Sequence, residues 1–342
     1  MSETNLPPLS VDFAPAWWRA HYGMDFGEEL WRDPLRRVES DRDRRRLLWE
    51  RFGEVGLGEA DPAPRPNVAA QMHRFMAAVW GCEIRYLPDQ SPAAVALPAP
   101  LEQMERLRLP DLETSPVVRR VFQEARTLES HYGFCEAGLD LGAPLNNAVS
   151  VFGAEILTTC LTDPDLARRV LLLMAQALLA VELEVTDPLN HQSFPPPRPR
   201  GFLGNCPVCM VSPRTYQEVV LPADLWYRQH FQELSLHHCG PMHAYLEVYR
   251  ALAPNALDVG FTSDRRQVRA AYPDLPLSLM LEASALVKKS ETEVDDLVGG
   301  MLQDAGPPEL ITSIWVAEAG PEVADETVHS LMTAPERLRR VL

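Results

Sequence analysis

Four residues in two short stretches carry the side chains that bind soft metal ions. Cys206 and Cys209 form a Cys-x-x-Cys pair, and His237 and Cys239 form a His-x-Cys pair just ahead of Gly240. A zinc ion takes about four ligands in tetrahedral array, and imidazole and thiolate are its commonest set. The two pairs together predict a zinc site made by His237, Cys239 and one or both of the other cysteines.

Other interpretations of the Cys-x-x-Cys pair stay open at this level. The pair can be a structural turn beneath a loop, or a redox pair, although the strand-to-helix context of thioredoxin-like motifs is missing. Residues i and i+3 of an extended strand face opposite ways, so both sulfurs reach one ion only if the chain turns. Pro207 favours such a turn.

The elements that position these residues follow from the sequence periodicity. In Leu234–Cys239, strand alternation places Ser235, His237 and Cys239 on one face and the apolar residues, with His238, on the other. From residue 201 onward, apolar strand-like runs alternate with helical runs, which indicates βαβ units and a parallel sheet. His237 and Cys239 then lie at the carboxyl end of a strand, where barrel enzymes place working residues.

The predicted fold is a single (β/α)8 TIM-type barrel of the α/β class with extra amino-terminal helices. Residues 1–66 are expected to form the helical extension and residues 67–342 the barrel. In the first half of the barrel, the patterns predict a strand over Asn146–Phe152 and a long helix from Asp163 to Glu184.

Composition excludes several classes of function. The chain has 32 Lys and Arg against 48 Asp and Glu, a net charge of −16, which repels nucleic acids and anionic membrane surfaces. The amino terminus shows no secretory signal pattern. The most apolar run, Val170–Val185, contains Gln176, Glu182 and Glu184 and indicates a buried helix, so we expect a cytoplasmic protein without a membrane span.

Residues 201–330 resemble the uroporphyrinogen decarboxylase superfamily, which includes zinc- and corrinoid-linked methyltransferases. Three stretches carry the resemblance: SPRTYQEVVLPADLWYRQHF, LHHCGPMHAYLEVYRALAPNALDVGF and ELITSIWVAEAGPEVADETVHSLM. They are similar to the family's Ser-Pro helix, its strand ending in His-x-Cys-Gly, and its last strand with the closing helix. In the amino-terminal half, VWGCEIRYLPD and LRLPDLETSPVV resemble the family more faintly.

Two departures from the family's pattern bear on the reaction. The decarboxylases have an Arg-rich amino-terminal loop and an Asp that holds the pyrrole nitrogens, but Gln71, Met72 and His73 stand where that Asp falls. A tetrapyrrole decarboxylase is therefore disfavoured. The methyltransferase branch holds zinc with the His-x-Cys that His237 and Cys239 match.

The further cysteine of the methyltransferase branch lies in the last barrel strand, where this chain reads SIWVAEAG. Its members with a Glu ligand place that Glu on the strand where this chain has Asp258. The site carried over from the family is therefore incomplete, and we expect Cys206 or Cys209 to supply the missing sulfur.

The resemblance implies a zinc-dependent methyltransferase that activates a substrate thiol or handles a corrinoid-linked methyl group. Asp258 and Asp264 are candidates for orienting the substrate or a histidine proton, and Asn205 for aiming an amide at the site; helix capping is the alternative for Asp264. A small-molecule substrate, a corrinoid protein and a second copy in a homodimer are the expected partners.

Two other functions remain open. One is a cofactor-independent decarboxylase or lyase of a carboxylated small molecule. The other is a non-catalytic metal- or corrinoid-binding protein, in which four protein ligands close the zinc shell.

Overall fold

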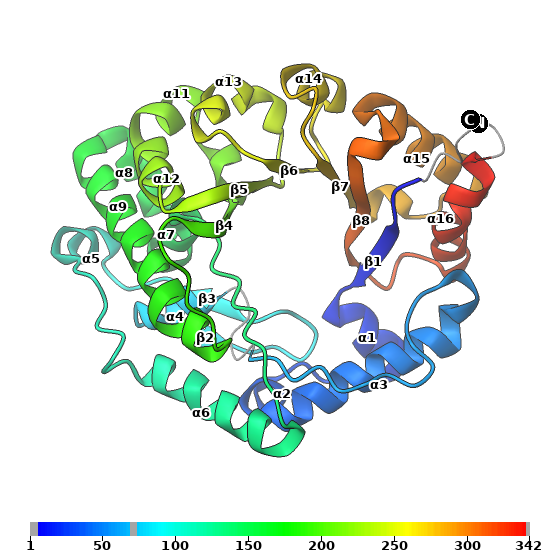
Figure 1. The fold of residues 1–342 in the computed structure, drawn as a ribbon, viewed down its shortest axis with the longest axis horizontal. Coiled ribbons are helices and arrows are strands. Elements are labelled where there is room, and N and C mark those ends of the chain that lie inside the picture. Colours follow the sequence, from blue (N-terminus) through cyan, green and yellow to red (C-terminus); the bar gives the residue numbers. More distant parts are fainter. Residues whose placement is uncertain (1–5, 69–73, 340–342) are drawn as a thin grey trace.

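The main sheet is a curled, all-parallel sheet of six strands in the order β1-β8-β7-β6-β5-β4. The computed structural model describes residues 6–68 and 74–339. Figure 1 shows the sheet as an arc around the centre of a ring. Its strands are β1 (Leu9–Phe13), β4 (Arg198–Gly204), β5 (Phe231–His238), β6 (Ala256–Val259), β7 (Leu277–Glu282) and β8 (Ile311–Ala319).

The structure contains only part of the predicted closed, eight-stranded barrel. Two further strands, β2 (Glu83–Arg85) and β3 (Ala93–Val95), form an antiparallel pair separate from the main sheet. Among the described residues the sheet ends at β1 and β4 and is not closed by strand pairing. The protein is therefore an α/β protein with a curled parallel half-barrel. Because β1 pairs with β8, the segment before residue 66 also contributes a strand to the sheet.

Helices surround this sheet and complete the ring. They are α1 (Pro15–Tyr22), α2 (Glu28–Arg32), α3 (Pro34–Phe52), α4 (Phe75–Val79), α5 (Pro100–Arg106), α6 (Pro116–Tyr132), α7 (Pro144–Phe152), α8 (Glu155–Thr162), α9 (Pro164–Val181), α10 (Asp187–Leu189), α11 (Pro213–Thr215), α12 (Leu221–Arg228), α13 (Leu246–Tyr249), α14 (Arg265–Ala271), α15 (Glu291–Ala305) and α16 (Asp325–Leu338). Many of them begin with proline, whose fixed φ suits the first helical turn.

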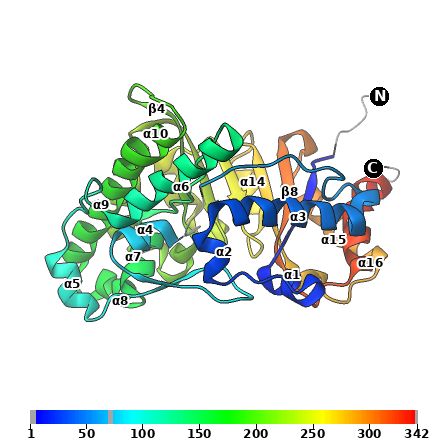
Figure 2. The same cartoon turned by 90° about the horizontal axis from the view of Figure 1, so that it is seen from below.

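Helices α2, α3 and α6 lie on the side of the ring opposite β5, β6 and β7 (Figures 1 and 2). A buried ion pair joins α3 to α6, since Arg37 Nη2 lies 2.7 Å from Glu124 Oε2. At the other end of α3, Arg51 donates to both carboxylate oxygens of Asp325 on α16, at 2.6 and 2.8 Å. Helices therefore span the side of the ring that the sheet leaves open.

Two expectations about single elements have different outcomes. The long helix predicted from Asp163 is confirmed as α9, which Asp163 caps by accepting a hydrogen bond from Leu166 N at 3.1 Å. The strand predicted over Asn146–Phe152 is wrong, because these residues belong to helix α7. Pro144 begins this helix, and its buried apolar residues recur at helical spacing, which the strand prediction overlooked.

The two faces of the sheet differ in chemistry. Leu203 on β4 and Leu234 and Leu236 on β5 are fully buried beneath the outer helices. On the inner face, His237, Asp258, Ser278 and Ser313 are successive register partners across β5 to β8. This row of polar side chains points into the ring. No helix in the described part of the chain has the length and apolar character needed to cross a membrane.

Candidate metal centre

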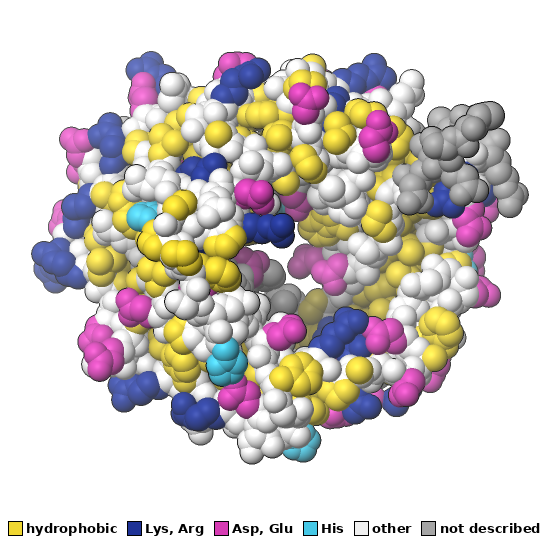
Figure 3. All heavy atoms as spheres, in the orientation of Figure 1, with side chains coloured by type: hydrophobic (Ala, Val, Ile, Leu, Met, Phe, Trp, Pro, Cys, Tyr) yellow, Lys and Arg dark blue, Asp and Glu magenta, His cyan; other side chains and the backbone are white. Residues whose placement is uncertain are grey.

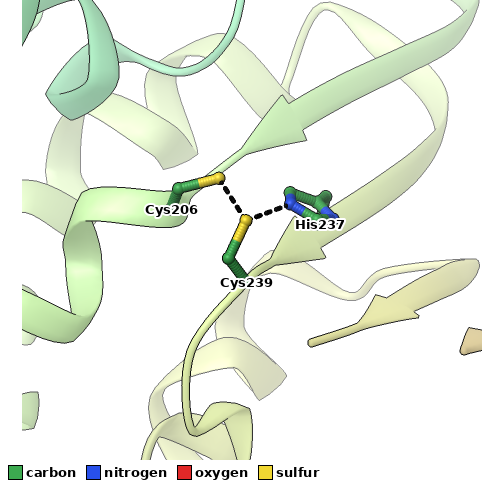
Figure 4. A group of neighbouring side chains, drawn as sticks. All are labelled: Cys206, His237 and Cys239. Carbon is green, nitrogen blue, oxygen red and sulfur yellow. Dashed lines mark hydrogen bonds between the residues drawn. The ribbon is translucent and has the colours of Figure 1, made fainter. Parts of the chain in front are cut away.

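Three of the four predicted ligands lie together at the carboxyl ends of β4 and β5. Cys206 Sγ lies 2.9 Å from Cys239 Sγ, and His237 Nε2 lies 2.8 Å from the same sulfur. The ligand atoms of all three residues lie within 4.8 Å of one another. Figure 4 shows the two cysteines and the imidazole converging from the ends of neighbouring strands.

A short turn after β4 separates the two cysteines of the Cys-x-x-Cys pair. Residues Cys206–Met210 form a 3-10 helix with Pro207 in its first turn, and the backbone N–H of Asn205 donates to His237 O at 2.8 Å. Cys206 is thereby placed beside β5. Cys209 is exposed, and its thiol donates to Cys206 O at 3.2 Å. Among the described residues, Cys209 lies outside the ligand group.

The Asp258 carboxylate, on the next strand, contacts the ring nitrogen of His237 that faces away from the sulfurs. Its Nδ1 atom lies 2.9 Å from Asp258 Oδ2, while Trp315 Nε1 on β8 donates to Asp258 Oδ1 at 3.0 Å. A carboxylate at Nδ1 fixes the imidazole orientation and leaves Nε2 for a metal, as in many zinc sites. Side chains on β5, β6 and β8 therefore together fix the orientation of the His237 imidazole.

Only Cys206 already favours the deprotonated form that binds a metal, whereas His237 and Cys239 would each release a proton on ligation. The hydrogen bond from Cys239, together with His237, lowers the pKa of Cys206, whereas the same bond raises the pKa of Cys239. Burial lowers the pKa of His237, but hydrogen bonds with Asp258 and Cys206 outweigh it and raise this pKa to about 9. By contrast, burial raises the pKa of each isolated cysteine to about 11; these are Cys82, Cys135 and Cys160. A thiolate is therefore already favoured at Cys206.

Asn205 belongs to a buried network behind the ligands. Its Nδ2 donates to Asp224 Oδ2 at 2.9 Å, and the Tyr216 hydroxyl donates to the same oxygen at 2.7 Å. Asn205 and Asp224 are fully buried. Because Asn205 immediately precedes Cys206, this network anchors the turn that carries the cysteine.

The remaining predicted residues lie outside the ligand group. Asp264 is the N-cap of α14, where its Oδ1 accepts from Gln267 N at 3.1 Å. His238 is fully buried on the outer face of β5, as the alternation predicts, and its Nδ1 lies 2.7 Å from the Tyr249 hydroxyl. The segment Gln71–His73, where the decarboxylase Asp was sought, lies outside the described residues.

Sequence reasoning missed the roles of Trp315, Asp224 and Tyr216. Trp315 was noted only as part of a strand that lacks a cysteine, yet its indole fixes Asp258. The available signal was that Trp315 lies two residues after Ser313 and so on the same, inward face of β8. Asp224 and Tyr216 lie in a helical stretch whose pattern gives no sign of their contact with Asn205.

Comparisons with known proteins identify the fold. No family model and no curated protein sequence matches the chain. A solved structure, a methyltransferase from Methanosarcina mazei, matches with a TM-score of 0.58 at 13% sequence identity, covering 97% of this chain and 94% of that chain. At this identity the likeness concerns the fold alone. The chain therefore has a methyltransferase-like fold with a Cys-His-Cys group that could hold a metal ion.

Proposed function

We propose that this protein is a zinc-dependent methyltransferase of the uroporphyrinogen decarboxylase superfamily, acting on a thiol substrate. The observation that carries the proposal is the convergence of Cys206, His237 and Cys239 within 4.8 Å at the carboxyl ends of two neighbouring strands. The methyltransferase-like fold and the sequence resemblance give independent support. The half-barrel is then a variant of the superfamily's (β/α)8 barrel.

The donor set suits zinc. Two sulfurs and one imidazole nitrogen are soft and borderline ligands, which favour zinc over magnesium or calcium. Catalytic zinc sites commonly use three protein ligands and leave one position for a substrate or water, whereas structural sites have four. Since Cys209 is turned away, the three-ligand group favours a catalytic site over a closed structural one.

The protein's own side chains orient the histidine ligand. Zinc would lower the pKa of a coordinated substrate thiol, so that the acceptor is a thiolate at neutral pH. Asp258 keeps the Nε2 atom of His237 directed at the sulfurs, and Trp315 keeps Asp258 in place. Cys206 and Cys239 are only half-buried, so the group is not sealed from solvent.

We further propose that the methyl group comes from a corrinoid, carried by a partner protein. In this reaction a methyl cation would move from cobalt(III) to the thiolate sulfur. The cobalt–carbon bond breaks as the sulfur–carbon bond forms, and the products are cobalt(I) and a thioether. Free methylcobalamin with 2-mercaptoethanol is the simplest assay, and mass spectrometry of the methylated thiol is the readout. Failure of the wild type to form this product above the level without protein would contradict the methyl-transfer reaction.

Metal analysis of the purified protein tests the site directly. The wild type should contain close to one zinc per chain, and Cys206→Ala and Cys239→Ala should each lose most of it. Cys209→Ala is the matched control, because this sulfur lies outside the group, and it should keep its zinc. Equal zinc in all four proteins, or none in the wild type, would contradict the assignment.

A further inference from the structure

Phe202 is a large hydrophobic residue that is exposed on the inner face of the sheet, next to the Cys-His-Cys group. It lies on β4, two residues before Gly204, and its register partner on β5 is Ser235. The residue is 45% exposed. Figure 3 shows a hollow at the centre of the ring, bordered by hydrophobic and charged side chains. Among the described residues, the contacts that hold the ligands do not include Phe202, so they do not account for an exposed ring here.

The ring of Phe202 leans toward the ligands. A Cβ added to Gly204 would lie 3.3 Å from Phe202 Cε1 and 3.8 Å from its Cζ. The ring therefore covers Gly204 on the face of the sheet that carries His237, the register partner of Gly204. Cys206 follows Gly204 by two residues. The glycine thus leaves room for an aromatic ring beside the turn that carries a ligand.

Trp315 provides a second aromatic surface on the other side of His237. The centre of its ring lies 6.4 Å from the centre of the His237 imidazole. Met280 on β7 is its register partner and adds a second apolar side chain to the same face. In the strand order, β5 lies between β4 and β8, so the imidazole lies between the strands of Phe202 and Trp315. A thiol at the Cys-His-Cys group therefore has an aromatic residue on each side.

The acidic side chains near the group disfavour an anionic substrate. Asp258 already uses both carboxylate oxygens, one toward His237 and one toward Trp315. Glu282 lies on the same face of β7 as Met280 and is exposed, so it adds negative charge at the carboxyl end of the sheet. A carboxylate or sulfonate on the substrate would be repelled by these groups. An ammonium group would gain little from Glu282, because exposed ion pairs contribute little.

A basic side chain on β4 is already paired. Arg200 Nε lies 3.4 Å from Oε2 of Glu233, its register partner on β5. Arg200 precedes Phe202 by two residues and so lies on the side of the ring that faces away from Cys206. The body of a substrate bound at the ligands would therefore meet the phenyl ring before it meets this cation.

We propose that the acceptor is a thiol with a neutral, apolar body, such as an arylalkyl thiol, and that Phe202 determines this specificity by contacting that body. The inference rests on the proposed function, because it places the thiol sulfur at the Cys-His-Cys group. Contact with the ring removes apolar surface of both partners from water, which stabilises the complex. A polar or charged thiol gains only the contact of its sulfur.

Thiol titrations of the cobalt(II)-substituted protein test the inference by binding, without turnover. Cobalt(II) occupies tetrahedral sites of sulfur and nitrogen, and its absorption spectrum changes when a thiolate joins the ligands. The probes are phenylmethanethiol, 2-mercaptoethanol, 3-mercaptopropionate and cysteamine, whose bodies are aromatic, neutral and polar, anionic, and cationic. We expect phenylmethanethiol to bind at least about tenfold more tightly than each of the others. Equal affinities, or tightest binding of a charged thiol, would overturn the inference.

Variants test the role of Phe202 itself. Phe202→Ala should weaken phenylmethanethiol about tenfold and leave 2-mercaptoethanol unchanged, whereas Phe202→Leu, which keeps an apolar side chain, should retain most of the affinity. Trp49→Ala is the matched control, because Trp49 is 44% exposed on α3, across the ring from β5, and it should bind all four thiols like the wild type. An unchanged preference in Phe202→Ala would overturn the inference.

The same titrations separate this inference from the proposed function. A cobalt spectrum of the wild type that none of the thiols changes would contradict the thiol-binding centre, and the specificity with it. A spectrum that all four thiols change with equal affinity would contradict the role of Phe202 alone. Before thiol is added, the cobalt spectra of the variants should equal that of the wild type, because Phe202 is not a ligand.

Discussion

Asp258 and His237 are register partners on adjacent parallel strands, and Asp258 Oδ2 lies 2.9 Å from His237 Nδ1. The contact follows from the sheet itself, because paired residues on neighbouring strands point to the same side. The opposite ring nitrogen, Nε2, faces the sulfur of Cys239 at 2.8 Å. The strand pairing therefore determines which nitrogen is offered to a metal.

Replacing Asp258 should weaken metal binding without removing a ligand. In Asp258→Ala the imidazole loses the carboxylate that orients it, and loss of such a partner typically lowers metal affinity about 10- to 100-fold. Competition with a chromogenic zinc chelator measures the change. Ser278→Ala, on the next strand of the same row, is the control and should bind zinc like the wild type. An unchanged affinity in Asp258→Ala would show that this contact does not support the ligand.

Gly260→Ala should disrupt the site through sterics alone. A Cβ at this position would lie 2.1 Å from Cys239 O and 2.3 Å from His238 O, so the backbone beside the ligands must move. Such overpacking costs about 1–3 kcal/mol of unfolding free energy, and we expect zinc to be lost as well.

Gly300→Ala is the control for that change. A Cβ there meets open space on helix α15, and alanine should stabilise the helix by up to about 1 kcal/mol. Urea denaturation of both variants measures the two effects. Wild-type stability and zinc content in Gly260→Ala would show that the loop accommodates a side chain.

The buried carboxyl of Asp224 should make stability depend on pH. Burial raises its pKa from 3.8 to about 6, despite hydrogen bonds from Tyr216 and Asn205 that lower it. The folded state therefore keeps a proton that the unfolded chain releases. Its contribution to stability is fully present below about pH 4 and is lost as pH rises through 6, a change of about 3 kcal/mol.

Asp224→Asn removes this titration while keeping an oxygen that accepts hydrogen bonds. Urea denaturation between pH 4 and pH 7 should show a smaller fall in stability with rising pH for the variant than for the wild type. Parallel curves for the two proteins would mean that Asp224 does not titrate in this range.

Much of the site could be predicted because it depends on local patterns. Strand alternation placed His237 inward and His238 outward, and the spacing of the ligands pointed to a metal. The choice between Cys206 and Cys209 could not be made from sequence, since it depends on where the turn around Pro207 brings each sulfur. The contacts of Trp315 and Asp224 depend on chain segments that are distant in sequence.

The fold was predictable to a similar extent. Alternating strands and helices after residue 201 indicated the parallel sheet, which the structure contains. The strand predicted over Asn146–Phe152 was wrong, because a short apolar run suits a buried strand and a buried helix equally well. The sequence did not predict that helices complete the ring, because this arrangement depends on contacts between distant segments, such as the ion pair of Arg51 with Asp325.

X-ray absorption at the zinc edge, with and without an added thiol, tests the central claim most directly. We expect two sulfur ligands and one imidazole from the protein with a light atom in the fourth position, and a third sulfur when 2-mercaptoethanol is added. A spectrum with four protein ligands that the thiol does not change would contradict a thiol-activating centre at Cys206, His237 and Cys239.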